Sequence, residues 1–219
     1  MPLLAGVDGC RTGWVVVTDG GAAVVPTFAA VLGSLPGDAI IAIDIPIGLA
    51  DHYERGGRAC DRQARAALGR ARGSSVFPAP PRPGLGARTL AAARARGWPA
   101  TLQALNLLPK IEEVDACLTP RLQARVFEAH PELAFRDLNG GSPVVPNKRT
   151  ADGRARRWAL LAAAGIPQPA RPYAGEAEDD LVDACAELWI ARRLARGDAV
   201  RVPPTPPHDA RGLRMEIWR

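Results

Sequence analysis

The feature that most constrains the fold is a short, uninterrupted apolar run, Ala39-Ile-Ile-Ala-Ile43, which ends on Asp44. A strand without alternating polar residues is typical of a parallel sheet that helices cover on both faces. A second short apolar run, Leu3 to Asp8, also ends on an acid. The sequence therefore predicts an α/β protein in which carboxylates follow the central strands.

The strand and helix patterns follow one another in an order that predicts a topology. The expected strands are Leu3–Asp8, Trp14–Thr18, Ala22–Phe28, Ala39–Ile43 and Leu122–Glu128. Asp19-Gly20-Gly21 is a hairpin signal, and we expect the first three strands to form an antiparallel meander. A short helical stretch leads into the fourth strand, and a right-handed crossover makes that strand a parallel neighbour of the first. We expect the fifth strand to lie beside the fourth.

The segment from about 51 to 120 has a different character. It contains an arginine-rich helical pattern, a proline-rich loop and two further helical stretches. Because it is too long for a connection inside a compact domain, we interpret it as a mostly helical insertion. The expected fold class is α/β: a mixed five-stranded sheet, antiparallel in strands 1–3 and parallel in strands 1, 4 and 5, flanked by helices within a single domain over 1–219.

Composition limits the protein classes further. With 219 residues the chain can bury a sizeable core. It has no long apolar run typical of a membrane span and no basic N-terminal region typical of a signal peptide. Its four cysteines form no CxxC pair, which favours free thiols in a reducing cytoplasm. The net charge is +5, and only Lys110 and Lys148 are lysines, which is compatible with a polyanionic partner or with a GC-rich genome.

The expected topology brings acidic residues from distant parts of the sequence to one edge of the sheet. The candidate catalytic residues are Asp8, Asp44, Glu128, Asp180 and Asp183, of which the last two share one face of a helix. Carboxylates that meet raise one another's pKa unless a cation is present. Mg²⁺ or Mn²⁺ suits such oxygen ligands, and two ions about 3.5–4 Å apart are the usual machinery for phosphodiester hydrolysis. The sequence therefore predicts a site for metal-assisted hydrolysis.

Each acid taken alone also has an ordinary structural interpretation. Asp8 and Asp44 could cap the turns that follow them, and Asp180 lies near a helix start, where acids are favoured without any function. Asp183 is different because it lies within the apolar sequence Leu181-Val-Asp-Ala-Cys185, and a buried carboxylate needs a partner. The joint pattern is more specific than any one of its members.

Seven ordered motifs, spread over nearly the whole chain, resemble domain-of-unknown-function family 429, a group of predicted nucleases with a ribonuclease H-like fold. The motifs are Gly6-Val-Asp-Gly9 with Gly13-Trp14, Ile43-Asp-Ile-Pro-Ile-Gly-Leu49, Arg58-Ala-Cys-Asp-Arg62, Ser75-Val-Phe-Pro-Ala-Pro-Pro-Arg82, Pro109-Lys-Ile-Glu-Glu-Val-Asp115, Glu128-Ala-His-Pro-Glu-Leu-Ala-Phe135 and Asp179-Asp-Leu-Val-Asp-Ala184. The resemblance implies a ribonuclease H-like fold and a nuclease activity.

The acidic motifs are also similar to those of bacterial Holliday-junction resolvases, which have an acid on strand one, an acid on strand four and a D-x-x-D-A helix. This likeness implies that Asp8, Asp44 and Asp183 are metal ligands and that Asp180 is a ligand or a water-positioning base. The strand-four acid here is Asp, where the resolvases have Glu, so the metal would lie nearer the backbone. Glu128 has no clear counterpart; it is either an extra metal ligand or a structural acid paired with an arginine.

Candidate substrate-binding residues are basic. Arg58 and Arg62 could follow a phosphate backbone from one helix face, and Lys148 and Arg149 could bind a scissile phosphate; solvated or ion-paired charges are the alternative in both cases.

The predicted partner is nucleic acid, DNA or RNA, and the predicted function is a metal-dependent nuclease. A phosphotransferase or ATPase of the sugar-kinase and actin fold, and a non-catalytic nucleic-acid-binding protein, are the competing hypotheses.

Overall fold

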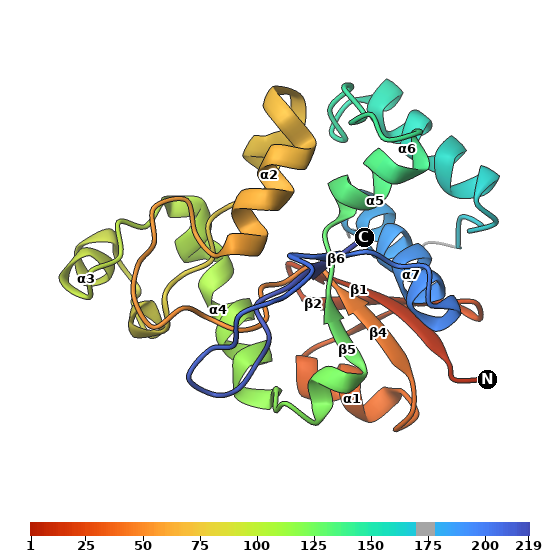
Figure 1. The fold of residues 1–219 in the computed structure, drawn as a ribbon. Coiled ribbons are helices and arrows are strands. Elements are labelled where there is room, and N and C mark those ends of the chain that lie inside the picture. Colours follow the sequence, from red (N-terminus) through yellow and green to blue (C-terminus); the bar gives the residue numbers. More distant parts are fainter. Residues whose placement is uncertain (170–177) are drawn as a thin grey trace.

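The computed structural model describes residues 1–169 and 178–219 (Figure 1). The strands are β1 (Leu4–Cys10), β2 (Gly13–Thr18), β3 (Gly21–Val25), β4 (Ile40–Ile43), β5 (Val126–Glu128), β6 (Arg201–Val202) and β7 (Ile217–Trp218). The α-helices are α1 (Phe28–Ser34), α2 (Ala59–Arg72), α3 (Leu90–Ala95), α4 (Leu102–Cys117), α5 (Pro131–Leu138), α6 (Ala151–Ala163) and α7 (Glu178–Arg196). Short 3₁₀ turns are formed by Gly73–Ser75, Arg82–Gly84 and Leu122–Ala124.

The central sheet has the predicted strand order. Across the sheet the strands follow the order β3-β2-β1-β4-β5. β4 is parallel to both β1 and β5, and the other neighbouring pairs are antiparallel. The prediction of a mixed five-stranded α/β sheet is therefore confirmed. The remaining two strands, β6 and β7, form a separate hairpin that the sequence analysis did not anticipate.

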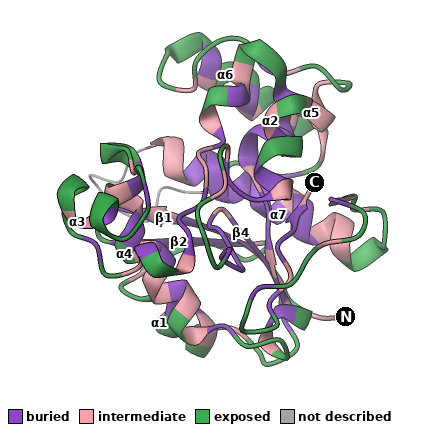
Figure 2. Ribbon diagram, turned by 60° about the vertical axis from the view of Figure 1, so that its left-hand side comes forward, coloured by how far each residue is buried: buried purple, intermediate pink, exposed green. Residues whose placement is uncertain are grey.

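Side chains alternate between two apolar layers, one on each face of the sheet. Trp14 and Val16 of β2 pack in the layer that α1 and α4 cover. Val15 and Val17 pack in the opposite layer, which contains α7 and parts of α5 and α6. In Figure 2 strands β1, β2 and β4 and helix α7 are mostly buried, whereas α3 and α6 carry exposed outer faces. The sheet therefore has helices on both faces, as the apolar run of the fourth strand predicts.

Three predicted strand limits were wrong. The third strand ends at Val25 rather than at Phe28, because Thr27 caps helix α1, which begins at Phe28. β1 continues to Cys10, so Asp8 lies inside this strand, paired with Val15 of β2, rather than at its end. The fifth strand covers only Val126–Glu128, because the preceding residues Leu122–Ala124 form a 3₁₀ turn. Local propensity does not fix the limits of β1 and β5, since pairing with neighbouring strands sets where a strand ends.

The segment between β4 and β5 carries α2, α3 and α4, as the mostly helical pattern predicts. In Figure 1 these helices lie to one side of the sheet. However, Ile111 and Val114 of α4 pack in the core under the sheet, so α4 belongs partly to the central fold. No helix among the described residues is long and apolar enough to cross a membrane.

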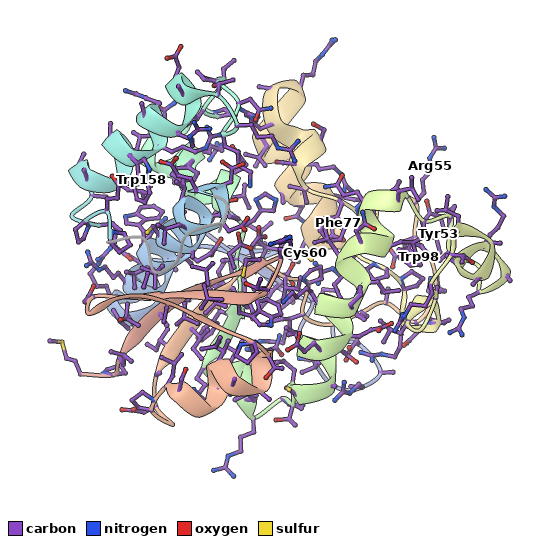
Figure 3. The ribbon with its side chains drawn as sticks, turned by 180° about the vertical axis from the view of Figure 1, so that it is seen from behind. Tyr53, Arg55, Cys60, Phe77, Trp98 and Trp158 are labelled. Atoms are coloured by element: carbon purple, nitrogen blue, oxygen red, sulfur yellow. The ribbon has the colours of Figure 1, made fainter. Side chains whose placement is uncertain are left out.

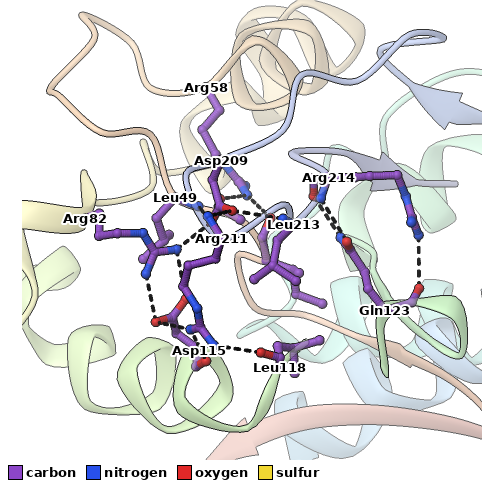
Figure 4. Close-up of polar contacts among 12 residues, drawn as sticks. Leu49, Arg58, Arg82, Asp115, Leu118, Gln123, Asp209, Arg211, Leu213 and Arg214 are labelled. Atoms are coloured by element: carbon purple, nitrogen blue, oxygen red, sulfur yellow. Dashed lines mark hydrogen bonds and ion pairs between the residues drawn. The ribbon is translucent and has the colours of Figure 1, made fainter. Parts of the chain in front are cut away.

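The C-terminal segment is tied to this helical region by ion pairs and hydrogen bonds (Figure 4). The carboxylate of Asp209 accepts hydrogen bonds from the Leu49 and Leu213 amides, at 3.1 and 2.9 Å, and pairs with Arg82. Arg82 also pairs with Asp115 of α4, at 3.0 Å. The network joins the loop after β4, helix α4 and the C-terminal segment.

Candidate functional site

Strand register places two aspartates on the face of the sheet that α7 covers. Gly6 of β1 pairs with Ala42 of β4, and side chains two residues further on lie on the same face. Asp8 and Asp44 are at those positions, and the Asp44 amide donates a hydrogen bond to the Val7 carbonyl at 3.1 Å. The two acids therefore lie side by side where β1 and β4 stop pairing.

Helix α7 can approach this face closely because β1 carries a glycine. A Cβ at Gly6 would lie 2.0 Å from the Ala184 carbonyl oxygen and 2.1 Å from the Leu188 amide nitrogen. This contact sets the height of α7 above the sheet and brings the preceding residue, Asp183, to the acids of the strands. The side chain of Asp183 is only 4% exposed.

A lysine supplies positive charge to the three aspartates. The ammonium of Lys148 contacts Asp183 Oδ2. Its loop is held by Arg72, which donates to the Val144 and Val145 carbonyls at 2.8 Å, and by Arg157, which donates to the Pro146 carbonyl at 2.9 Å. Although burial lowers the pKa of Lys148, the charges of Asp183, Asp8 and Asp44 raise it above its usual value.

The pKa values of the acids show the cost of bringing them together. Burial, followed by repulsion from Asp44 and Asp183, raises the pKa of Asp8 well above its usual range. Burial also raises the pKa of Asp44, and raises that of Asp183 to about 6 despite the nearby lysine. Burial is the largest cause at all three aspartates, and repulsion between carboxylates adds to it at Asp8 and Asp183.

The aspartates form part of a cleft of about 560 Å³. One wall comes from the β1–β2 turn and the exposed face of α4, and the other from the start of α5 and the loop before α6. His130 borders the cleft and caps α5, because its Nδ1 accepts a hydrogen bond from the Glu132 amide at 3.2 Å. The cleft therefore combines an acidic floor with walls from the helical segment and from the C-terminal half of the chain.

Two of the predicted site residues bind each other instead of facing the cleft. Glu128 is two residues after Val126, whose side chain packs in the layer under α1 and α4, and thus lies on the opposite face from Asp44. Its carboxylate accepts hydrogen bonds from Arg58, at 2.5 and 2.8 Å, and from the Ile47 amide at 2.6 Å. Of the two interpretations of Glu128, these contacts favour the structural acid paired with an arginine over the extra metal ligand. The Arg58 side chain is only 2% exposed, so it is not placed to bind a nucleic-acid backbone.

The remaining predicted residues divide between the cleft and its surroundings. Lys148 and Arg149 both line the cleft. Arg62 is exposed on α2 and pairs with Glu54 at 2.8 Å, away from the acids. Asp180 is half-buried in the first turn of α7, near enough for its charge to raise the pKa of Asp8.

One acid of this cluster, Glu187, is not among the residues predicted from the sequence. It is fully buried one helical turn after Asp183, and neither of its carboxylate oxygens has a hydrogen-bond partner within the described residues. Burial and repulsion from Asp44, Asp8 and Asp183 raise its pKa well above the usual value. Like Asp183, Glu187 is an acid within an apolar helical stretch, and it lies four residues later on the same helix face, so the same sequence signal identifies it.

The acids gathered here offer carboxylate oxygens, the type of ligand that a hard divalent cation prefers. Within the described residues no three Asp, Glu, His or Cys side chains form a complete ligand set as they stand. Nevertheless, buried carboxylates with raised pKa values and an unpartnered glutamate are what oxygen-preferring ions such as Mg²⁺ or Mn²⁺ stabilise. Asp8, Asp44 and Asp183 would hold such an ion, with Glu187 behind them.

The raised pKa values predict how stability depends on pH without metal. A carboxyl whose pKa is higher in the folded than in the unfolded state loses stabilising free energy as the pH rises through its folded value. For Asp183 that value is about 6. A carboxyl whose pKa is lowered by folding, such as Asp209, changes the stability only at lower pH. We expect the thermal midpoint measured in EDTA to fall between pH 5 and 7.5, by about 2–4 °C for each kcal/mol lost.

Added Mn²⁺ should restore the midpoint at pH 7.5, because the ion compensates the carboxylate charges. Asp183→Asn provides the matched comparison and should flatten the pH dependence. A midpoint that rises or stays constant between pH 5 and 7.5 in EDTA would contradict the electrostatic description of the cluster.

Fold and site together define an α/β protein whose mixed sheet carries an acidic cluster where its central parallel strands stop pairing. The chain belongs to the family described as protein of unknown function (DUF429), whose model matches residues 6–208. Comparison with curated proteins and with solved structures gives no significant match.

Proposed function

We propose that this protein is a metal-dependent nuclease of ribonuclease H-like fold, which hydrolyses phosphodiester bonds of nucleic acid with Mg²⁺ or Mn²⁺ ions. The observation that carries the proposal is the convergence of Asp8, Asp44 and Asp183 in one cleft, although they lie on three separate elements. Because several carboxylates meet here, we expect the cluster to hold two ions rather than one.

Bound divalent ions would supply an activated water and would stabilise the leaving oxygen. The chain's own contribution is to hold the carboxylates at the positions set by the β1–β4 register and the close contact of α7. Lys148 would partly neutralise the acids before an ion binds and would then be free to contact a phosphate oxygen.

Two arginines in the cleft support a phosphate-bearing substrate. The guanidinium groups of Arg11 and Arg149 line the cleft, are exposed, and have no hydrogen-bond or ion-pair partner within the part of the chain that the structure describes. By contrast, arginines such as Arg58 and Arg82 are held by carboxylates. Unpaired guanidinium groups beside an acidic cluster are suited to binding phosphate oxygens.

A cleavage assay tests the proposal. Purified protein is incubated with single-stranded, duplex, hybrid and branched DNA and RNA, with Mg²⁺ or Mn²⁺ and with EDTA. We expect metal-dependent products from at least one of these substrates. ATP hydrolysis is measured in parallel, because turnover of ATP without cleavage of any nucleic acid would instead indicate the phosphotransferase alternative. Failure to cleave every substrate would contradict the proposal.

Arg149→Ala should weaken nucleic-acid binding and reduce its dependence on salt. Each phosphate contact contributes a slope of about −0.7 to −0.9 to log K against log[salt], so the absolute slope should decrease by about that amount. Binding is measured by fluorescence anisotropy in Ca²⁺ at several NaCl concentrations. Arg94→Ala is the control, since Arg94 is exposed on α3 outside the cleft. Equal slopes for Arg149→Ala and wild type would refute a phosphate contact.

A further inference from the structure

Helix α4 forms one wall of the cleft and presents polar side chains that make no hydrogen bond within the described residues. Gln103 and Asn106 lie one turn apart on its exposed face and line the cleft. Their amides make no hydrogen bond within the described residues, whereas the opposite face of α4 packs Ala104 and Leu108 into an apolar cluster. A primary amide both donates and accepts hydrogen bonds, as the edge of a nucleobase also does.

An aromatic side chain borders the same cleft. Phe77 is half-buried and packs against the cluster that contains Trp98 and Leu108, and it also lines the cleft; Figure 3 shows it beside α4. Pro78 follows it directly and restricts its backbone to an extended conformation. The ring is therefore held in place by the core without being covered, as an aromatic ring that stacks on a ligand must be.

These groups share one cleft with the acidic floor, and the size of that cleft limits what can enter. A volume of about 560 Å³ is that of a pocket for a single small molecule. A phosphate held at the aspartates through their cations would bring its neighbouring base into the cleft that Phe77 and α4 also line. A base inside a duplex is already paired and stacked and cannot make such contacts without leaving the helix, whereas the bases of a single strand are free to do so.

We infer that the cleft binds nucleic acid as a single strand, with one unpaired base held between Phe77 and the amides of Gln103 and Asn106. The inference rests on the proposed function, because the aspartates fix where the phosphate lies. It specifies the substrate class: single-stranded DNA or RNA, or a single-stranded region within a larger nucleic acid.

Binding of short oligonucleotides tests the inference separately from cleavage. Fluorescein-labelled 12-nucleotide single strands of DNA and RNA, and duplexes of the same sequence, are titrated with protein in Ca²⁺. We expect at least one single strand to bind about ten-fold or more tightly than its duplex. Phe77→Ala and Phe77→Leu should both weaken this binding by about 5- to 150-fold, the range for the loss of one base–aromatic stack, while Phe77→Tyr retains it.

The leucine variant is the critical control, since it keeps an apolar side chain in the core but removes the ring. Tighter binding of the duplex, or wild-type affinity of Phe77→Leu for single strands, would overturn the inference. Equal affinity for a nucleoside monophosphate and for the 12-nucleotide strand would also overturn it, because the cleft would then be a mononucleotide site. Binding that depends on Phe77 without any cleavage in Mg²⁺ or Mn²⁺ would support this inference and contradict the proposed nuclease activity.

Discussion

Replacing Asp44 by asparagine should reduce metal-dependent cleavage at least about 100-fold, because removal of residues that merely support a metal ligand already costs about 10–100-fold. Asparagine has nearly the same shape as aspartate but lacks the charge that holds a cation. Initial rates on the best substrate, measured at several Mn²⁺ concentrations, give the comparison.

The same substitution should leave the metal-free fold intact. Burial raises the pKa of Asp44, and the charge of Asp44 repels Asp8 and Glu187, so removal of that charge relieves repulsion within the cluster. The thermal midpoint in EDTA should therefore equal or exceed that of the wild type. Asp38→Asn is the matched control, since Asp38 is exposed at the other end of β4. Wild-type cleavage by Asp44→Asn would show that the cluster is not the reaction centre.

Substitution of Gly6 by alanine should destabilise the protein more than any other single methyl added to β1. The new Cβ would meet backbone atoms of α7 at about 2 Å, and backbone cannot move aside as a flexible side chain can. Overpacking typically costs about 1–3 kcal/mol, and we expect about 3 kcal/mol or more at this contact. That corresponds to a decrease of about 6–12 °C in the thermal midpoint.

Gly9→Ala tests whether the effect is specific to the helix contact. Gly9 lies in the same strand, but the atoms nearest to a Cβ there belong to the Lys110 and Trp14 side chains, at 3.7 Å, an ordinary van der Waals distance. We expect a change of less than about 1 kcal/mol, and any Mn²⁺-dependent stabilisation should remain. Gly6→Ala, by contrast, should lose that stabilisation because displacement of α7 separates Asp183 from Asp8. Similar stability of the two variants would contradict this account of how α7 is positioned.

The sheet order could be predicted because it depends on strong local signals. The all-apolar run before Asp44 specifies a buried parallel strand, and the Asp-Gly-Gly turn specifies a hairpin. The right-handed crossover then places the fourth strand beside the first. Asp8, Asp44 and Asp183 could be singled out for the same reason, since each lies beside or within apolar sequence. The structure brings these three together in one cleft.

The features of the site that could not be predicted from the sequence depend on contacts between residues far apart in the chain. The face of Glu128 follows from a register in which it pairs with Ile43, and a shift by one residue would have turned it toward Asp44. Arg58 shows no sign in its own sequence context that Glu128 lies next to it. The cleft wall of Gln103 and Asn106 likewise depends on the packing of α4 under the sheet, which a helical pattern alone does not orient.

A crystal structure grown with Mn²⁺, with anomalous diffraction data collected at the manganese edge, is the most direct test of the central claim. We predict an anomalous peak between Asp8, Asp44 and Asp183, with the Lys148 ammonium moved away from the Asp183 carboxylate. A structure without such a peak, in which Lys148 still contacts Asp183 at saturating Mn²⁺, would contradict the assignment of these aspartates as a metal centre.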